Sequence, residues 1–388
     1  MPGPRTERPY LLDVSRLIWR AWRGKLPTGI DRVCQAYVEH FGARSRAVVQ
    51  RGGFQWVLSD AHSSRLFELL LSAGTNQRVK LLRLAAAAWI GAFVSMLRPG
   101  SIYLNVGHTG LNEDSLPRWI ASHQLRAVYL IHDLIPLSHP EYCRPGEAEK
   151  HGRRMNNVLA SAAGIIGNSQ ATLDEMEAFA ARQGKVMPPS VVEWISGGDF
   201  ARGVEPKRLP TPHFVTIGTI EGRKNHQILL DAWRKIVVER GKNAPSLVII
   251  GQRGWQADEV FEQLDNLGEL RDHVVELDAC DDRDLAGWIA GAQALLMPSF
   301  AEGFGLPVFE ALHAGTAVIA ADLPVYREIA GNIPTFAAPD DVEGWARIIG
   351  EFCDGGDELE RQRVAMAGFT APSWGSHFST VESWLADL

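Results

Sequence analysis

Cysteine is scarce in this sequence, with four among 388 residues, and the four lie far apart. They show neither the CxxC spacing of zinc sites nor the density of a disulfide framework. The four are Cys34, Cys143, Cys280 and Cys353. The opening residues, MPGPRTERPY, also lack the apolar core of a signal peptide. Both absences favour a cytoplasmic protein with reduced thiols.

An excess of positive charge is missing as well. The formal net charge is −7 and the isoelectric point is about 6.0. Nucleic acids are bound through concentrated Lys and Arg, which neutralise the phosphate backbone. We therefore expect no nucleic-acid partner.

Apolar runs long enough to cross a bilayer are also lacking. The nearest candidate, Leu84–Leu97 (LAAAAWIGAFVSML), is shorter than the ~20 apolar residues that a spanning helix needs. Basic residues stand around it at Arg78, Lys80, Arg83 and Arg98. Two interpretations follow: a buried core helix with solvated ends, or a helix that makes a peripheral contact with an anionic membrane surface.

What the sequence does contain is an alternation of short apolar runs, rich in Val and Ile, with helical patterns. This alternation is typical of parallel sheets covered by helices, so the expected fold class is α/β. The length and the 46% hydrophobic content favour two domains. In the first half we expect strands at Tyr10–Val14, Ala47–Val49, Phe54–Leu58, Ser101–Asn105, Ala127–Ile131, Gly164–Gly167 and Val191–Trp194.

The periodicity lapses into Gly, Pro and charge around residues 197–212, which predicts a domain boundary. Two Rossmann-like domains in tandem are the simplest account, with a ligand cleft between the carboxyl ends of their strands. No GxGxxG follows a strand, so a dinucleotide-binding fingerprint is absent. In the second half we expect strands at His213–Ile217, Ser246–Ile250, Val274–Leu277, Ala294–Met297 and Ala317–Ala320, and helices at Lys224–Glu239, Ala257–Leu267, Asp282–Ala290 and Pro307–His313.

The most informative stretch, MPSFAEGFGLPVFEAL, follows the expected strand Ala294–Met297 and reads as strand, glycine loop and helix. Gly303 and Gly305 allow the backbone to come close to a ligand, and Pro307 suits a first helical turn. The N–H groups of such a loop and of the helix start can hold a diphosphate.

Two carboxylates flank this loop. Glu302 stands on the loop, and Glu310 falls near the first turn of the helix with its side chain leaning back toward the helix start. Acceptor-only groups suit the hydroxyls of a sugar and a ribose. Taken singly, Glu310 could equally complement the helix dipole, and Glu302 could be a solvated loop charge.

The stretch resembles the retaining family-4 glycosyltransferases, which have the GT-B fold of two Rossmann-like domains facing across a cleft. Their signature is an E-x7-E pattern in an EGFGLP-type loop, present here as EGFGLPVFE. The resemblance implies that Glu302 binds hydroxyls of the donor sugar and that Glu310 binds the ribose. It also implies that the loop meets the diphosphate through Gly303, Phe304, Gly305 and Leu306.

A second motif, IGTIEGRKNH, begins at Ile217 where a strand gives way to a helix. A cation pair at that place suits a phosphate group, and it opposes the helix dipole, which favours a functional reason for it. By resemblance, Arg223 and Lys224 neutralise the leaving diphosphate, and Gly218 belongs to the donor site. The alternative is plain surface charge.

A strand of the first half ends in His132-Asp133, at the carboxyl edge where open α/β sheets bind ligands. A His-Asp pair alone is weak evidence, because a satisfied core histidine is commoner than a catalytic one. The family resemblance implies that His132 contacts the donor sugar from the opposite wall of the cleft.

Two further loops resemble family loops near the donor. The early segment PTGIDRV offers Thr28-Gly29 in place of the commoner glycine pair, so Gly29 is a candidate phosphate contact. Arg32 beside it could bind acceptor or phosphate, or simply charge a helix face. The loop Gly251–Trp255 follows a strand, and there Arg253 is a candidate nucleotide contact.

A metal site is not expected. The cluster CDDRD at residues 280–284 invites that interpretation, but Asp281 or Asp282 is a natural cap for the helix that follows. The resemblance also implies that Arg and Lys neutralise the diphosphate without a metal, so no cofactor is expected.

The resemblance implies two domains and a return helix: residues 1–205 on the acceptor side, residues 206–371 binding the nucleotide-sugar, and residues 372–388 packing back on the first domain. It implies transfer of a hexose, with mannose or rhamnose type favoured, from a nucleotide diphosphate-sugar to a glycan or lipid-linked oligosaccharide in surface polysaccharide assembly. The anomeric configuration would be retained by a front-face path.

Three other interpretations share the architecture. A nucleotide-sugar epimerase would place its carboxylates differently, and a sugar phosphorylase would bind pyridoxal phosphate through a lysine. A non-catalytic glycan-assembly subunit could keep the scaffold without the chemistry. The complete set Glu302, Glu310, Arg223 and Lys224 favours an enzyme.

Overall fold

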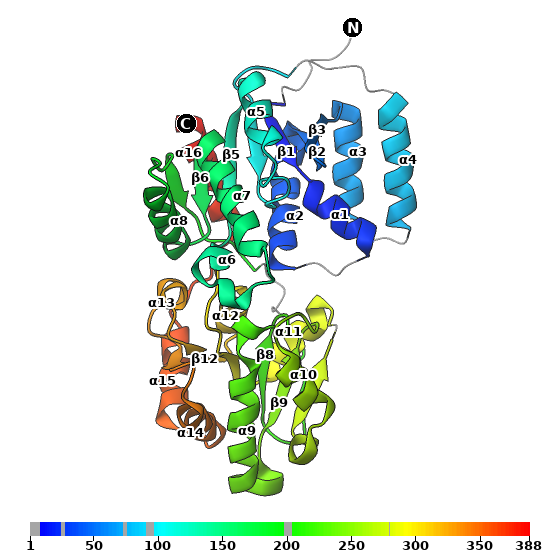
Figure 1. Cartoon of the computed structure of the whole chain (residues 1–388). Helices are drawn as coiled ribbons and strands as arrows, with labels where there is room; N and C mark the ends of the chain where they lie inside the picture. The colour runs from blue at the N-terminus through cyan, green and yellow to red at the C-terminus, as the bar shows by residue number, and fades with distance from the viewer. Residues whose placement is uncertain (1–7, 25–27, 73–75, 91–96, 198–203, 279) are drawn as a thin grey trace. The chain divides into compact units, whose positions relative to one another are not determined.

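The computed structural model describes all residues except 1–7, 25–27, 73–75, 91–96, 198–203 and 279 (Figure 1). The chain forms two compact units. Unit 1 comprises Met1–Leu137, Ala148–Ile195 and Trp374–Leu388, and unit 2 comprises Ser138–Glu147 and Ser196–Ser373. Each unit is a Rossmann-like α/β layer structure, which confirms the predicted fold class.

Unit 1 is built on a seven-stranded sheet in the order β3-β2-β1-β4-β5-β6-β7. Every neighbouring pair is parallel except β2 and β3, which form an antiparallel edge. The order of strands reverses between β1 and β4, which is where open sheets of this kind form a crevice. The strands are β1 (Tyr10–Asp13), β2 (Ser45–Arg51), β3 (Phe54–Val57), β4 (Ile102–Asn105), β5 (Arg126–Ile131), β6 (Ala162–Gly167) and β7 (Ser190–Val192).

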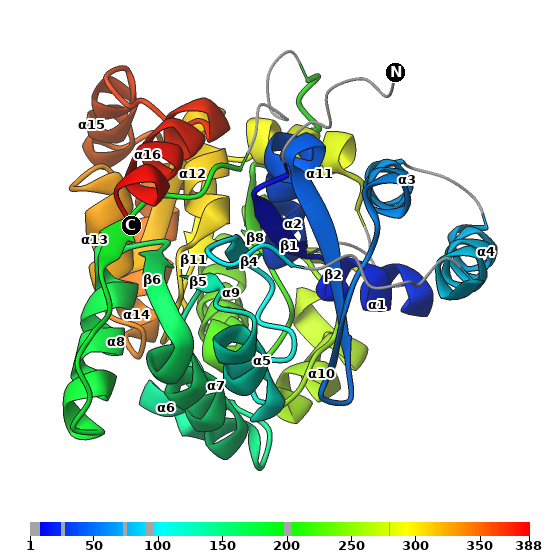
Figure 2. The ribbon, with the colours of Figure 1, turned by 90° about the horizontal axis from the view of Figure 1, so that it is seen from above.

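Helices α3 and α4 stand side by side at one end of this sheet, next to α1 (Figure 2). Helix α4 contains the first part of the apolar run Leu84–Leu97, whose residues 91–96 lie outside the described part of the chain. The helices in this half are α1 (Ser15–Arg23), α2 (Gly29–Phe41), α3 (Asp60–Leu71), α4 (Gln77–Ile90), α5 (Ser115–Ser122), α6 (Ile135–Ser138), α7 (Glu147–Ser161) and α8 (Gln170–Arg182). No described helix is both long and apolar enough to cross a membrane.

The C-terminal helix α16 (Trp374–Asp387) packs in unit 1, far from its neighbours in sequence. The Tyr37 hydroxyl lies 2.9 Å from Nε2 of the buried His377. The ring of Phe378 stands edge-on to Tyr37 at 5.1 Å. Gly164 of β6 makes room for the helix, because a Cβ there would lie 2.4 Å from the indole of Trp384. The expected return of the C-terminal helix to the N-terminal region is confirmed.

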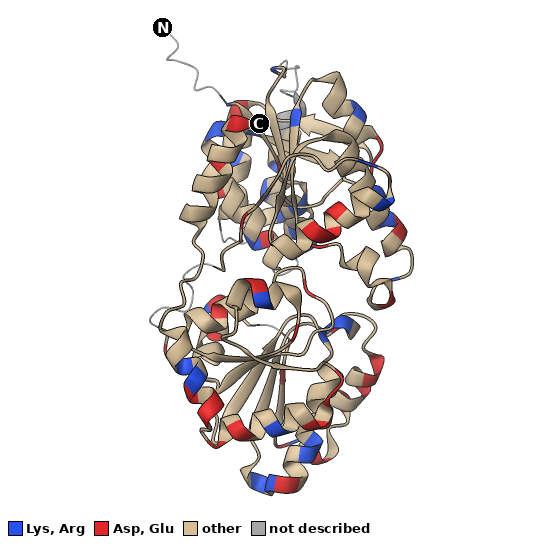
Figure 3. Cartoon of the chain, turned by 90° about the vertical axis from the view of Figure 1, so that its left-hand side faces the viewer, with Lys and Arg blue, Asp and Glu red and all other residues tan. Residues whose placement is uncertain are grey.

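Unit 2 holds a six-stranded parallel sheet in the order β10-β9-β8-β11-β12-β13. Charged residues lie on its helices and loops, whereas β8, β9, β11 and β12 carry none (Figure 3). Strands buried on both faces read as continuous apolar runs for this reason. The strands are β8 (His213–Ile217), β9 (Ser246–Ile250), β10 (Val274–Leu277), β11 (Ala294–Met297), β12 (Ala317–Ala321) and β13 (Thr335–Ala337).

Two tryptophans without exposed surface, Trp233 and Trp345, lie in the main apolar core of unit 2 together with Phe214 and Phe352. The helices that enclose this sheet are α9 (His226–Arg240), α10 (Asp258–Asp265), α11 (Asp282–Gly291), α12 (Leu306–His313), α13 (Pro324–Ala330), α14 (Val342–Cys353) and α15 (Asp357–Met366). Asp281 caps α11 by accepting a hydrogen bond from the Asp284 amide at 2.7 Å, as one of the two predicted caps.

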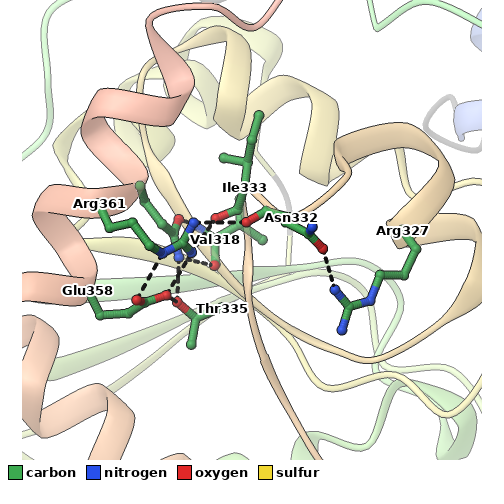
Figure 4. A network of polar contacts seen from close by, with 8 residues as sticks. Val318, Arg327, Asn332, Ile333, Thr335, Glu358 and Arg361 are labelled. Atoms are coloured by element: carbon green, nitrogen blue, oxygen red, sulfur yellow. Dashed lines mark hydrogen bonds and ion pairs between the residues drawn. The ribbon is translucent and has the colours of Figure 1, made fainter.

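A polar network fixes α15 against the edge of this sheet (Figure 4). The side chain of Gln362, which has no exposed surface, exchanges two 2.9 Å hydrogen bonds with the backbone of Val318 in β12. Thr335 of β13 donates to Glu358 at 2.6 Å, and Arg361 donates to Glu358 and to the Ile333 carbonyl. The helix thereby satisfies buried polar groups of the sheet.

Candidate active site

Two loops of unit 2 bring together three of the predicted site residues. One loop follows β8 and carries Arg223 and Lys224, and the other follows β11 and carries Glu302. Arg223 Nη1 lies 2.9 Å from Glu302 Oε2, and Lys224 Nζ lies 2.5 Å from Glu302 Oε1. Strands β8 and β11 are neighbours in the sheet at the point where the strand order reverses. This is the place where such sheets bind ligands.

The geometry of the β8 loop explains how the two cations reach Glu302. Arg223 and Lys224 lie in a short 3₁₀ turn, Gly222–Lys224, and Asn225 then adopts a left-handed conformation with φ of 55°. The side-chain amide of Asn225 donates hydrogen bonds to the backbone carbonyls of Pro298 and Pro339, at 3.1 and 2.7 Å. Helix α9 therefore begins at His226, two residues later than predicted, because Asn225 turns the chain first.

The side chains of this ion-pair cluster are largely buried. The side chains of Lys224 and Glu302 are 11% and 7% exposed. Burial by itself would raise the pKa of Glu302, but the charges of Lys224 and Arg223 outweigh it and hold that pKa at about 2. Burial lowers the pKa of Lys224, where the like charge of Arg223 acts against the attraction of Glu302. A water-poor pair of cations of this kind can bind phosphate oxygens strongly.

The glycine loop has the backbone that a close approach requires. Gly305 has φ of +92°, and a Cβ there would lie 2.6 Å from Cε1 of the buried Tyr326. Helix α12 starts at Leu306, with Pro307 in its first turn as predicted. Phe304 is buried and stacks on Phe309 at 5.3 Å. The glycine loop therefore leads from Glu302 directly into the first turn of α12.

Glu310 lies in the second turn of α12 and is 5% exposed. Its side chain packs beside Gly197, where a Cβ would lie 2.9 Å from Glu310 Cγ. Gly197 lies just before the segment 198–203, which is outside the described residues. The second carboxylate of the E-x7-E pattern is thus inside the unit, one helical turn beyond the loop that begins with Glu302.

The two remaining predicted residues of unit 2 differ in their surroundings. Gly218 lies against the tip of Lys224, because a Cβ there would be 3.2 Å from Nζ, so this glycine leaves room for the ammonium group. Arg253 lies farther out: it binds Glu276 at 2.7 Å and Asp265 at 2.8 Å and covers the ring of Phe261. Arg253 thus pairs with two carboxylates at a partly exposed place, separate from the hydrogen bonds that join Lys224, Arg223 and Glu302. Its predicted contact with the nucleotide stays a prediction.

Sequence reasoning missed Glu221. This carboxylate is 3% exposed, and its Oε1 lies 2.6 Å from Nε of Arg223. Burial raises its pKa, and the charges of Arg223 and Lys224 oppose that rise. Glu221 thus holds the other side of the Arg223 guanidinium. Its position in the TIEGRKN motif was a usable signal, since a carboxylate two residues before an arginine in a turn can pair with it.

Two predicted residues lie in unit 1. His132 follows β5 and is 4% exposed, and its Nε2 lies 2.8 Å from the Val106 carbonyl. Because a carbonyl can only accept, Nε2 carries the proton and Nδ1 is the acceptor. Burial lowers the pKa of His132 to about 4, so the ring is neutral at physiological pH. Gly29 is the first residue of α2.

The helix start at Gly29 is organised by a buried carboxylate that the sequence did not single out. Asp31 accepts hydrogen bonds from the Thr28 amide and hydroxyl, each at 2.7 Å. Arg16 and Arg20 of α1 also form ion pairs with Asp31, with Nε to carboxylate oxygen distances of 2.7 and 2.6 Å. This arrangement fixes Thr28 in front of Gly29 and gathers two cations there.

Within the described part of the chain, no three His, Cys, Asp or Glu side chains gather closely enough to hold a metal ion. The acidic cluster at residues 280–284 includes the helix cap Asp281. The residues that the loops bring together are cations and a carboxylate, which suit a phosphate and a hydroxyl.

Comparison with known proteins agrees with this geometry. Residues 211–354 match the family described as glycosyl transferases group 1. Serotype-specific mannosyltransferase WbdA of Escherichia coli is 30% identical over 245 residues, which are 57% of this chain and 30% of WbdA. O-antigen chain mannosyltransferase B of Escherichia coli is 29% identical over 238 residues, which are 58% of this chain and 61% of that protein. The chain thus spans 30% of the length of WbdA and 61% of the length of the second relative.

Solved structures show the fold. The Anabaena protein Alr3699/HepE, in complex with UDP and glucose, superposes with a TM-score of 0.67 at 16% identity and covers 98% of this chain and 100% of its own. Sucrose-phosphate synthase of Thermosynechococcus elongatus gives a TM-score of 0.63 at 15% identity, with 98% and 99% covered. The protein therefore has the GT-B fold. Its second half is similar to the glycosyl transferases group 1 family, as the motifs there indicated.

Proposed function

We propose that this protein is a retaining glycosyltransferase that moves a hexose, with mannose favoured, from a nucleotide diphosphate-sugar to a hydroxyl of a glycan. The observation that carries the proposal is the joining of Arg223, Lys224 and Glu302 at the strand-order reversal of unit 2. Relatives described as mannosyltransferases support the choice of mannose over rhamnose. The second relative is described as an O-antigen chain mannosyltransferase, which supports a glycan or lipid-linked oligosaccharide of a surface polysaccharide as acceptor.

In the proposed reaction, the bond between the anomeric carbon and the diphosphate oxygen breaks, and negative charge grows on the diphosphate. Arg223 and Lys224 stabilise that charge, together with the amides of the loop at Gly303–Leu306. The acceptor oxygen forms the new bond on the same face of the sugar. Its proton passes to the leaving phosphate oxygen, so the step requires no side-chain base.

The carboxylates and unit 1 take the remaining proposed roles. Glu302 accepts hydrogen bonds from donor-sugar hydroxyls, and Glu310 accepts them from the ribose. His132 offers Nδ1 as an acceptor for a sugar hydroxyl, and its neutral ring suits that role. Residues 1–205 form the acceptor side, residues 206–371 the donor side, and residues 372–388 the return helix. We propose action at the cytoplasmic face of a membrane.

The test is a donor panel. Purified protein is incubated with GDP-mannose, UDP-glucose, UDP-N-acetylglucosamine and dTDP-rhamnose, and release of the nucleoside diphosphate is measured with and without a mannose-terminated acceptor. We expect one donor to be preferred at least about tenfold, with release stimulated by the acceptor. No release from any donor, combined with no thermal stabilisation by GDP, UDP or dTDP, would refute the assignment.

A further inference from the structure

Helix α4 turns an apolar stripe toward solvent at the edge of unit 1, where it stands beside α1 and α3 (Figure 1, Figure 2). Among the side chains that the structure describes in this helix, residues 77–86, only Leu81 is buried. Val79 and Leu82 are 45% and 54% exposed. Val79 and Leu82 are three residues apart and Ala86 follows four residues later, so the three side chains share one face of the helix.

Basic side chains flank this stripe on both sides. Because successive residues are about 100° apart around a helix, Arg78 lies on one side of the stripe, whereas Lys80 and Arg83 lie on the other. All three are exposed. With the residues that the structure describes, none of the three forms an ion pair. Cations beside an exposed apolar stripe are typical of a helix that lies in the plane of a membrane surface.

The C-terminal end of α1 extends this surface. Gly24, which follows α1, lies beside α4, because a Cβ there would be 3.7 Å from Nη2 of Arg78. Trp22, which is 38% exposed, and the exposed Arg23 come just before Gly24. Tryptophan is enriched at membrane–water interfaces, where its amphipathic ring lies at the level of the headgroups. A second helix therefore brings an aromatic ring and a cation to the same part of unit 1.

The charge of this region is opposite in sign to that of the whole protein. Helices α1 and α4 contain no acidic residue, and α3, which packs against α4, carries Asp60 and Glu68. The formal net charge of the chain is −7. We define the α1–α4 surface by the exposed apolar and basic residues of these two helices: Trp22, Arg23, Arg78, Val79, Lys80, Leu82 and Arg83.

The combination of apolar and basic groups discriminates between possible partners. A nucleic acid would bind the cations through its phosphates but would leave Val79 and Leu82 in water. A protein partner would cover the apolar stripe, but the centres of protein interfaces are depleted of charged residues and of lysine in particular. A leaflet with anionic lipids suits both groups, because apolar side chains enter it and cations stay at its phosphates.

We propose that the α1–α4 surface docks on a membrane leaflet that contains anionic phospholipids. Val79 and Leu82 enter the boundary between headgroups and acyl chains, and the surrounding cations bind lipid phosphates. The docking itself depends on this surface alone. Its purpose, which is to bring unit 1 to a lipid-linked acceptor, rests on the proposed function.

The first experiment measures sedimentation of the full-length protein with vesicles of phosphatidylcholine alone and with vesicles that contain roughly 30% phosphatidylglycerol. At low salt we expect binding to the anionic vesicles to be at least about tenfold tighter. Salt screens exposed charges, so roughly 0.5 M NaCl should remove most of that preference. Equal binding to the two kinds of vesicle, or binding to neither, would overturn the proposal.

The second experiment removes cations. A variant with Arg78→Gln and Arg83→Gln should bind anionic vesicles at least about tenfold more weakly than the parent protein. The matched control carries Arg271→Gln and Arg283→Gln, which remove two exposed cations of unit 2 and change the net charge equally. We expect the control to bind within about twofold of the parent protein. Equal binding by the two variants would place the contact elsewhere on the protein.

The third experiment removes apolar surface. A variant with Val79→Ser and Leu82→Ser should bind anionic vesicles at least about fivefold more weakly. Its control carries Val238→Ser and Val364→Ser, at 78% and 69% exposed positions of unit 2, and should bind like the parent protein. Thermal melts establish that each variant is folded. Unchanged binding by the first variant would refute insertion of the stripe.

Sedimentation velocity without lipid tests whether the stripe instead faces a second copy of the chain. We expect the parent protein and the variant with Val79→Ser and Leu82→Ser to have the same oligomeric state. A dimer that these two substitutions dissociate would overturn the docking proposal.

A failure here is distinguishable from a failure of the proposed function. Donor cleavage with a soluble acceptor is measured without vesicles, and variants of the α1–α4 surface should leave that rate unchanged. Vesicle binding without donor cleavage would support the docking surface and refute the transferase. Donor cleavage without vesicle binding would do the opposite.

Discussion

Lys224 Nζ lies 2.5 Å from Glu302 Oε1, although the two residues are 78 positions apart in the sequence. Arg223 holds the other carboxylate oxygen at 2.9 Å, and the Ser299 hydroxyl donates to Oε1 at 2.7 Å. The Glu302 carboxylate therefore pairs with both cations that bind the diphosphate in the proposed reaction. A diphosphate bound at these cations would compete with Glu302, which would then be available to sugar hydroxyls.

Lys224→Ala should lower catalysis far more than stability. The variant leaves Arg223 as the remaining cation on Glu302, so we expect a loss of about 1–3 kcal/mol in the free energy of unfolding. Removing one of two groups that stabilise the leaving diphosphate should lower kcat at least about 100-fold. Chemical denaturation and donor turnover measure the two effects.

The matched control for this variant is Lys235→Ala. Lys235 is an exposed residue of helix α9, and its Nζ lies 2.7 Å from Oε1 of Glu343 in α14. An exposed ion pair contributes about 0–1 kcal/mol. We expect that variant to turn over the donor like the parent protein. Equal activity of the two variants would remove Lys224 from the mechanism.

Glu302→Gln should separate binding from transfer. The substitution removes the negative charge that competes for Arg223 and Lys224, so nucleoside diphosphate affinity should rise about fivefold, roughly 1 kcal/mol. Sugar transfer should fall at least about 100-fold if the carboxylate holds the donor sugar. Calorimetry with GDP and UDP, together with turnover assays, tests both directions.

Glu343→Gln, which removes the exposed partner of Lys235, is the charge-matched control and should leave nucleotide affinity unchanged. A fall in nucleotide affinity for Glu302→Gln would show that the carboxylate supports the diphosphate site rather than competing with it.

Gly305→Ala should destabilise unit 2 and weaken donor binding. Alanine at position 305 would have to keep the backbone φ of +92°, and its Cβ would lie 2.6 Å from the ring of Tyr326. That ring is buried and cannot move aside freely. We expect a loss of at least about 2 kcal/mol, which adds overpacking to the cost of a left-handed residue. Thermal unfolding and nucleotide affinity are the measurements.

Gly315→Ala separates the two causes, because Gly315 also has positive φ, +76°, but a Cβ there meets nothing within 4 Å. It should cost only about 1–2 kcal/mol for the backbone conformation. A loss for Gly305→Ala no larger than that for Gly315→Ala would argue against the close packing of the loop on Tyr326.

Acid should destabilise the docking of helix α16 through His377. Burial lowers the pKa of this histidine from 6.5 to about 4, so the folded state resists its protonation. Neutral His377 makes its full contribution to the free energy of unfolding above pH 6.5. This contribution is lost as the pH falls toward 4. The full loss is on the order of 3 kcal/mol.

His377→Gln cannot gain a charge, so its free energy of unfolding should fall less between pH 7 and pH 4.5 than that of the parent protein. Urea titrations at several pH values measure the difference. Parallel pH profiles for the two proteins would contradict the assigned cause. The exposed His123, substituted by Gln, provides the control, since this substitution should leave the profile unchanged.

Much of unit 2 could be predicted from the sequence. The expected strands His213–Ile217, Ser246–Ile250, Val274–Leu277 and Ala294–Met297 coincide with β8, β9, β10 and β11. Strands β8, β9 and β11 are buried on both faces, so the limits of their apolar runs mark the strand ends. The helix expected from Lys224 instead begins at His226, because the left-handed Asn225 is fixed by distant carbonyls of Pro298 and Pro339. Contacts so far apart in sequence leave no local signal.

The sequence by itself determined the strand, loop and helix around Glu302 and the residue types that the donor chemistry needs, because these depend on local periodicity, glycine and charge. Only the tertiary structure decided that Lys224 and Arg223 meet Glu302, and that Glu221 binds the other side of Arg223. The reason is the order of strands: β8 lies next to β11 in the sheet, so loops 78 residues apart become neighbours.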